Sequence, residues 1–134
     1  MTALMHAMIH NHTEAAKLLI RHDTNFDIQD TTGNSALFYA IQHNNELAKE
    51  LMRYTNVNLL NSAGETALML ALRNNNIEIF KELLEFGANP DLSIYPAWSP
   101  TLYATIYRHD IKQIIDENRG RVAAKRLLNL QYAQ

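Results

Sequence analysis

Three histidines fall within seven residues near the start of the chain, in the stretch HAMIHNH from His6 to His12. His6 and His10 are four positions apart, so on a helix the two imidazoles would share one face and could share a metal ion. A zinc site needs three or four ligands, and the nearest carboxylate, Glu14, is not where the motif H-E-x-x-H would place it. Whether the histidines form a site therefore depends on the elements that carry them.

The sequence carries no recognisable catalytic motif. It has no glycine-rich phosphate-binding loop, no G-x-S-x-G nucleophile motif and no cysteine. The carboxylates Glu78, Glu82 and Glu85 have the spacing of a solvated helix face, and the Ser and Thr side chains are needed as caps or in turns. We expect no enzymatic activity and no cofactor.

Short segments of the sequence repeat in step with one another. TALMHA, SALFYA, TALMLA and SPTLYA end on alanines that are 33, 31 and 33 residues apart, namely Ala7, Ala40, Ala71 and Ala104. Apolar quartets recur at intervals of 32, at 15/16/19/20, 47/48/51/52 and 79/80/83/84. Two registers with one period indicate a repeat architecture of about four units.

Each repeat is predicted to consist of two antiparallel helices followed by a hairpin. A Ser or Thr is predicted to cap each first helix (Thr2, Ser35, Thr66 and Ser99), and a polar break separates it from the apolar quartet of the second helix. The stretches 30–33 (DTTG) and 61–64 (NSAG) begin with Asp or Asn and end with Gly, which is typical of tight turns and predicts β-hairpin tips.

A unit of this length with a start like T-P-L-H-x-A resembles the ankyrin repeat, most clearly in residues 61–92. The resemblance implies an all-α, ankyrin-like solenoid forming a single domain over 1–134. Its repeats would span about 1–29, 30–60, 61–92 and 93–118. The histidine of the family motif is replaced in every repeat, so apolar packing must replace its hydrogen bonds; the substitutes are Met5, Phe38, Met69 and Leu102.

The end of the chain differs from its body. Residues 119–134 carry four basic and no acidic side chains, and apolar residues mark a helical stripe at 123, 124, 127, 128 and 130. Because the end units of a solenoid need a specialised outer face, we predict a C-terminal capping helix over about 120–132 that packs on repeat four.

The resemblance also implies a protein partner, bound on the concave surface of hairpin tips and first helices. Tyr95 and Trp98 are candidate hot-spot residues there, unless the fourth repeat folds them inward against the terminal helix. The full set of contact positions is Gln29, Thr31, Thr32, Asn34, Gln42, His43, Leu60, Ser62, Glu65, Arg73, Asn74, Tyr95, Trp98 and Tyr107.

In this repeat frame His6 occupies a packing position at the edge of the core, His10 the concave rim and His12 a turn. The three histidines would then not converge, so we expect no metal site beyond incidental binding of nickel or zinc by His6 and His10.

Four basic residues in a chain of net charge −2 are too few to predict nucleic-acid or membrane binding. We expect a monomer in the cytoplasm, or in a host cytosol if the chain is a secreted effector. The alternative hypothesis is a targeting or scaffolding portion of a larger multidomain protein.

Overall fold

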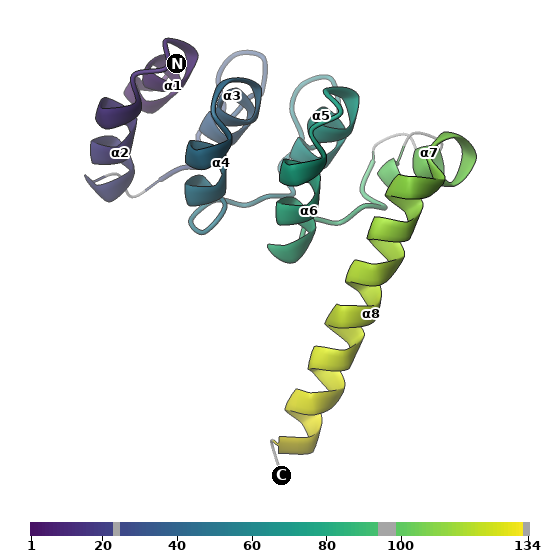
Figure 1. Ribbon diagram of the computed structural model, residues 1–134. Helices are drawn as coiled ribbons and strands as arrows, with labels where there is room; N and C mark the ends of the chain where they lie inside the picture. Colours follow the sequence, from purple (N-terminus) through teal and green to yellow (C-terminus); the bar gives the residue numbers. More distant parts are fainter. Residues whose placement is uncertain (23–24, 94–98, 133–134) are drawn as a thin grey trace.

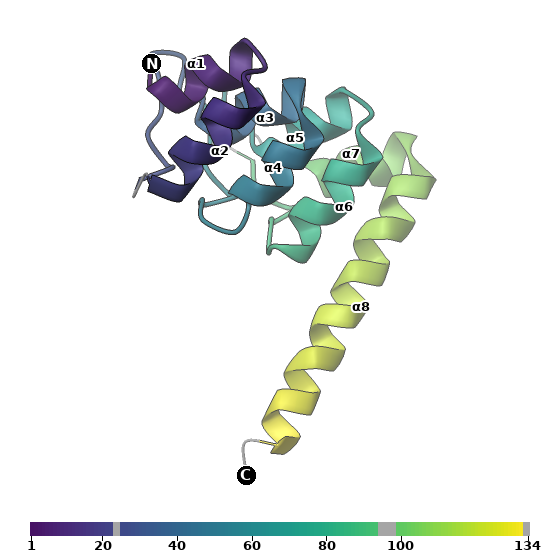
Figure 2. The same cartoon turned by 60° about the vertical axis from the view of Figure 1, so that its left-hand side comes forward.

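The computed structural model describes residues 1–22, 25–93 and 99–132, and this part of the chain contains eight helices and no strand. Four antiparallel helix pairs stand side by side, and the last helix leaves the stack as a long rod (Figures 1 and 2). The all-α solenoid predicted from the sequence is thereby confirmed. The pairs are α1 (Ala3–Ile9) with α2 (Thr13–His22), α3 (Ala36–His43) with α4 (Asn45–Leu51), α5 (Ala67–Arg73) with α6 (Ile77–Glu85), and α7 (Pro100–Tyr107) with α8 (His109–Tyr132).

Side-chain hydroxyl oxygens cap the N-termini of three of the four first helices, as predicted. The hydroxyl oxygens of Thr2, Thr66 and Ser99 accept hydrogen bonds from backbone N–H groups three residues later, at 3.1 to 3.2 Å. Each bond satisfies a donor that the first turn of a helix leaves without a partner. Ser35 occupies the same position in repeat two, but its side chain makes no such bond to α3, so the prediction of a hydroxyl cap is wrong there.

The core lies between neighbouring repeats, in two rows of helices. First helices contact first helices and second helices contact second helices along the stack. The residues that replace the family's histidine differ in burial: Met5 and Phe38 are buried and Met69 is partly buried. Leu102, in the last repeat, is 38% exposed because no described helix follows α7. Apolar packing therefore replaces the hydrogen bonds of the family's histidine in repeats one and two, and partly in repeat three, but not in repeat four.

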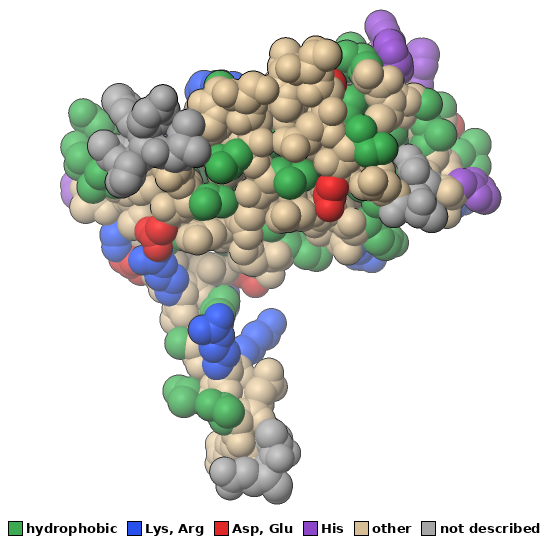
Figure 3. Space-filling model, turned by 180° about the vertical axis from the view of Figure 1, so that it is seen from behind, with side chains coloured by type: hydrophobic (Ala, Val, Ile, Leu, Met, Phe, Trp, Pro, Cys, Tyr) green, Lys and Arg blue, Asp and Glu red, His purple; other side chains and the backbone are tan. Residues whose placement is uncertain are grey.

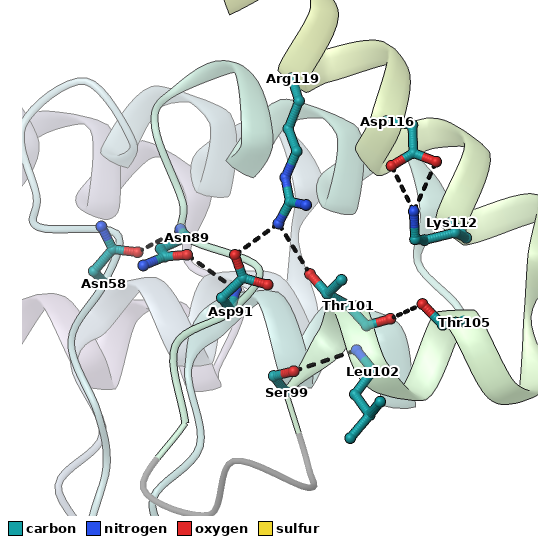
Figure 4. Close-up of polar contacts among 10 residues, drawn as sticks. All are labelled: Asn58, Asn89, Asp91, Ser99, Thr101, Leu102, Thr105, Lys112, Asp116 and Arg119. Atoms are coloured by element: carbon teal, nitrogen blue, oxygen red, sulfur yellow. Dashed lines mark hydrogen bonds and ion pairs between the residues drawn. The ribbon is translucent and has the colours of Figure 1, made fainter.

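The outer side of α8 is polar where the preceding helix is apolar. In α6 the side chains of Phe80 and Leu84 are buried against the stack. The positions 32 residues later are Lys112 and Asp116, which form an ion pair at 2.6 Å (Figure 4). A polar pair on this side of the last helix keeps apolar surface from meeting water there.

The connections between the paired helices alternate in length. Three residues join α1 to α2 and α5 to α6, whereas one residue joins α3 to α4 and α7 to α8. Each long connection contains an asparagine in the left-handed region, Asn11 at φ 55° and Asn75 at φ 54°, a conformation that asparagine tolerates better than most residues. Each of these asparagines accepts a hydrogen bond from the following short connection, from Asn44 Nδ2 at 3.3 Å and from Arg108 Nη2 at 3.3 Å.

The loops between repeats are tight turns, and the β-hairpins predicted for them are absent from the described residues. In the first tip, the Asp30 N–H donates to the Asn34 carbonyl and the Gly33 N–H donates to the Asp30 carbonyl, both at 2.9 Å. One backbone bond joins this tip to the next, from the Ser62 N–H to the Thr32 carbonyl at 3.0 Å. The bonds within each tip and between neighbouring tips hold these loops, and the described segments that flank them do not pair into a ladder.

The predicted capping helix over 120–132 is helical, but it is neither separate nor packed on repeat four. Those residues continue α8, whose first half is the second helix of that repeat and buries Ile111 and Ile115. All residues from 119 to 131 are exposed. The apolar stripe of this segment begins about half a turn round the helix from the buried face of the first half, so it points away from the stack.

Gly33 is the position where the loop network depends on the absence of a side chain. Its φ is +78°, and a Cβ there would lie 2.4 Å from the backbone nitrogen of Ser62. Gly87 has a similar φ of +92°, but nothing lies within 4 Å of its added Cβ. We therefore predict that Gly87→Ala costs about 1 to 2 kcal/mol of unfolding free energy and Gly33→Ala clearly more. Urea unfolding followed by circular dichroism measures both, and equal losses would show that the loop contact does not constrain the backbone.

Candidate partner-binding surface

Hydrogen bonds between neighbouring repeats hold the loop tips in place. The Gln29 side chain donates to the Gly33 carbonyl within its own tip and to the Leu60 carbonyl of the next repeat, both at 2.7 Å. Asn61 Nδ2 donates to Asn34 Oδ1 at 3.1 Å. Two of the predicted contact residues, Gln29 and Asn34, thus join adjacent loops. Thr31, Thr32 and Ser62 lie exposed at the tips.

Asp30 organises the first tip as a hydrogen-bond acceptor. Its Oδ1 accepts from the backbone N–H groups of Thr32 at 2.9 Å and Asn34 at 3.0 Å, and the Tyr39 hydroxyl donates to its Oδ2. Partial burial acts to raise the pKa of Asp30, but the hydrogen bonds from Tyr39, Thr32 and Asn34 outweigh it and lower that pKa to about 2. The same Asp30 carboxylate raises the pKa of Tyr39.

The second tip uses an uncharged residue for the same task. Asn61 Oδ1 accepts from the backbone N–H groups of Ala63 at 3.0 Å and Glu65 at 2.9 Å. Glu65 in turn forms an ion pair with Arg73 of α5. Both tips therefore have a side-chain oxygen acceptor at this position, charged in the first tip and uncharged in the second.

A polar hollow lies between repeats two and three, where α3 and α5 end. Three predicted contact residues, Gln42, His43 and Asn74, line it and are exposed. The hollow has a volume of about 880 Å³, and its remaining lining is Ile41, Asn44, Asn45, Asn75 and Asn76. No acidic or basic residue borders this hollow, so its chemistry is the hydrogen bonding of amides and an imidazole.

A more apolar groove lies between α5 and α7, with a volume of about 390 Å³ (the α5–α7 groove). Arg73 with its partner Glu65 also borders it, as does Arg108, which pairs with Asp110 at 2.9 Å. Its apolar lining is Met69, Leu72, Pro100 and Tyr103. Such a groove fits an apolar side chain, with charged groups at the border to orient what enters.

The contact positions transferred from the ankyrin family do not include most of the residues that line this groove. Met69 is in the position of Phe38, which is buried, and Tyr103 is in that of Leu70, which is also buried. Position in the repeat therefore predicted packing for both residues. Both residues instead border the α5–α7 groove, where Met69 is partly buried and Tyr103 is 37% exposed.

Tyr107 extends the groove along α7. It is 67% exposed, and its ring centroid lies 5.2 Å from that of Tyr103. Ile106, beside it, is 56% exposed. Tyr95 and Trp98, the two candidate hot-spot residues, lie outside the described residues.

The three histidines of the first repeat lie in a row, and the exposure of His6 corrects one expectation. His6 and His10 stack with ring centroids 6.4 Å apart, and His10 and His12 are 5.9 Å apart. All three are exposed. His6 is exposed, instead of packing at the core edge, because no described helix precedes α1, whereas Leu70 at the same position of repeat three is buried. Within residues 1–22, 25–93 and 99–132, no group of three His, Asp or Glu side chains could hold a metal ion.

Comparison with known proteins identifies the family to which this chain belongs. The family model for ankyrin repeats (3 copies) matches residues 1–59 and 45–120, and no curated protein matches the chain. This chain belongs to the ankyrin repeat family. Ankyrin repeats are generally protein-interaction modules without catalytic activity. Among the described helices, none is both long and apolar enough to cross a membrane.

Two solved structures share the fold. An ankyrin repeat domain from Acinetobacter baumannii AYE has a TM-score of 0.74 and 24% identity over 86% of this chain. A chain in the structure of the Bd0816 predatory endopeptidase from Bdellovibrio bacteriovorus in complex with immunity protein Bd3460 has a TM-score of 0.70 and 27% identity over 86% of this chain. The present chain spans 63% and 62% of those two chains, so it corresponds to less than two thirds of either.

The low pKa of Asp30 predicts how the first tip responds to acid. Asp30→Asn keeps an oxygen acceptor, as Asn61 shows, but removes the charge. Because the folded-state pKa lies below its ordinary value of 3.8, the carboxylate stabilises the fold above about pH 4, and this contribution is lost as pH falls toward about 2. We expect wild type to exceed Asp30→Asn by about 1 kcal/mol near pH 7 and to match it near pH 2. Urea unfolding at several pH values measures the difference; a gap that does not change with pH would exclude the proposed role of the charge.

Proposed function

We propose that this chain is a non-catalytic module that binds a protein partner on the surface formed by the loop tips and first helices, with the α5–α7 groove receiving an apolar side chain of the partner. The observation that supports this most is the groove itself, next to the exposed ring of Tyr107. Aromatic residues beside a pocket are the usual centre of binding energy in protein interfaces.

The surface is organised before binding, which favours recognition of a protein over a chemical role. Its loops are joined to one another by the Gln29 and Asn61 side chains, so little backbone ordering would be required on association. The two carboxyl groups whose pKa values fall to about 2, those of Asp30 and Asp110, accept hydrogen bonds that account for the shift. Both are thus held as anions at neutral pH, where a proton-transfer group would need a pKa near the working pH.

A second candidate function is more specific: the partner is an enzyme that this chain holds inactive. The chain's likeness to a structure of a predatory endopeptidase in complex with its immunity protein favours this, at 27% identity. Under either function the chain would act in the cytoplasm, or in a host cytosol if it is secreted. A role as the targeting or scaffolding portion of a larger protein is compatible with the same binding surface.

Site-specific photo-crosslinking in cells tests which surface binds. A photoreactive amino acid is placed at Tyr107 beside the groove, at Gln42 in the polar hollow, or at Arg21 on α2 as a control. We expect the first two to form covalent adducts with the same partner and Arg21 to form none. Adducts at Arg21 with none at Tyr107 would move the binding surface to the second helices.

The aromatic pair is expected to supply much of the affinity for the partner so identified. Tyr103→Ser with Tyr107→Ser should weaken binding by about tenfold or more, because an aromatic hot-spot residue contributes 2 kcal/mol or more. Lys81→Ser, on the exposed side of α6, is the matched control and should bind as wild type does. Calorimetry with the purified partner measures both, after circular dichroism has shown an intact fold. Unchanged affinity in the double variant would eliminate the groove as the centre of the interface.

A further inference from the structure

The last part of α8, residues 119–131, extends from the stack with every residue exposed (the arm). Figure 3 shows it below the body, with blue Lys and Arg and green hydrophobic side chains. At 1.5 Å per residue its 13 residues are about 20 Å long. An isolated helix of this length is marginal in water, so contacts with another surface would stabilise it.

The arm has an apolar stripe with one basic residue at its border. Helical spacing of 100° per residue places Leu127 and Leu130 on one side, with Arg126 next to Leu130, whereas Lys125 lies roughly opposite the two leucines. The leucine side chains are largely open to solvent, with Leu127 69%, Leu128 50% and Leu130 67% exposed. The arm contains four Lys and Arg residues and no Asp or Glu.

Polar contacts at its base fix the direction of the arm. Arg119 donates to Asp91 at 2.7 Å and to Thr101 at 3.3 Å, which ties α8 to the last described loop and to α7 (Figure 4). Arg121 pairs with Glu85 of α6 at 2.5 Å. Lys125 and Arg126, further out, have no ion-pair partner in the described part of the chain. The base of the arm is therefore fixed against its own stack, and the leucines further along the arm are left exposed.

A surface of matching chemistry lies on the second-helix side of the same chain, between α4 and α6 (the α4–α6 groove). Its volume is about 420 Å³, and it is lined by Glu46, Lys49, Glu50, Arg53, Tyr54, Glu82 and Phe86. Tyr54 is 57% and Phe86 39% exposed, which gives it apolar area. Lys49 is engaged by Glu78, whereas Glu46, Glu50 and Glu82 have no ion-pair partner among the described residues.

We propose that the arm of one copy of this chain binds the α4–α6 groove of a second copy, with its leucines on Tyr54 and Phe86 and with Arg126, at the border of the leucine stripe, near Glu50 and Glu82. A second copy is favoured over an anionic lipid or a nucleic acid because residues 1–118 carry eight basic and 14 acidic side chains, a net charge of −6 that those polyanions would repel. The self-association replaces the monomer expected from the sequence. Since one arm offers a small interface, the affinity is modest, in about the micromolar range or weaker.

Sedimentation of the full chain between about 5 and 500 µM tests the proposal. Wild type should form a dimer or a higher assembly that weakens as salt rises, because exposed charges are screened. Lys125→Glu with Arg126→Glu should weaken association by about tenfold or more, and so should Glu50→Lys with Glu82→Lys. The matched control is Lys17→Glu with Arg21→Glu on α2, which changes the net charge equally and should leave association intact.

Mixing the two charge-reversed variants gives the decisive measurement. Each then meets a partner of opposite charge, the reversed arm on the reversed groove and the unaltered arm on the unaltered groove, so association should return although neither variant associates alone. A wild type that stays monomeric throughout overturns the proposal. Association lost on arm reversal but unaffected by groove reversal overturns the choice of groove. A monomer whose arm binds vesicles of phosphatidylserine and phosphatidylcholine assigns the arm to a lipid surface instead.

Discussion

No repeat of this chain has a core of its own, and the rest of the structure follows from that constraint. The helices pack within each pair and against the neighbouring pairs, so that the buried apolar side chains form one continuous core. The same repeat position differs in burial along the stack: Met5 and Phe38 are buried, Met69 is partly buried and Leu102 is 38% exposed. The α5–α7 groove includes Met69, and the partner surface that we propose lies where this burial is incomplete.

The loops also depend on their neighbours, through hydrogen bonds. Turn residues accept hydrogen bonds from backbone N–H groups within each tip, and the side chains of Gln29 and Asn61 donate hydrogen bonds to the adjacent tips. This network rigidifies a surface that contains no regular secondary structure, which explains how exposed loops can present a defined shape. The first and last described repeats expose different kinds of side chain to solvent. The first repeat exposes three histidines, whereas the last exposes apolar side chains on α7 and an ion pair on α8.

The period of the sequence was sufficient to predict the helix pairs, three hydroxyl caps and the family, because spacing and caps are local properties. Contacts between neighbouring repeats could not be predicted from the period, because they depend on the side chains that the neighbouring repeat supplies. Tyr103 shares a repeat position with the buried Leu70, yet it is 37% exposed and lines the α5–α7 groove. The stripe at Leu127 and Leu130 correctly predicted a helix but not its contacts, since its phase relative to Ile111 and Ile115 determines the side that faces the stack. The prediction of β-hairpins was wrong because turn residues can define a loop tip without flanking strands that pair.

The alternating connections mean that neighbouring repeats are not interchangeable parts. Asn11 and Asn75, 64 positions apart, both lie in three-residue connections and both accept from the one-residue connection that follows. The smallest segment that repeats in full structural detail is therefore a pair of units. Deletion of repeat two or of repeat three alone would bring two connections of equal length side by side and would remove one of these hydrogen bonds. A change in repeat number inside the stack that keeps the alternation of the described connections requires steps of two units.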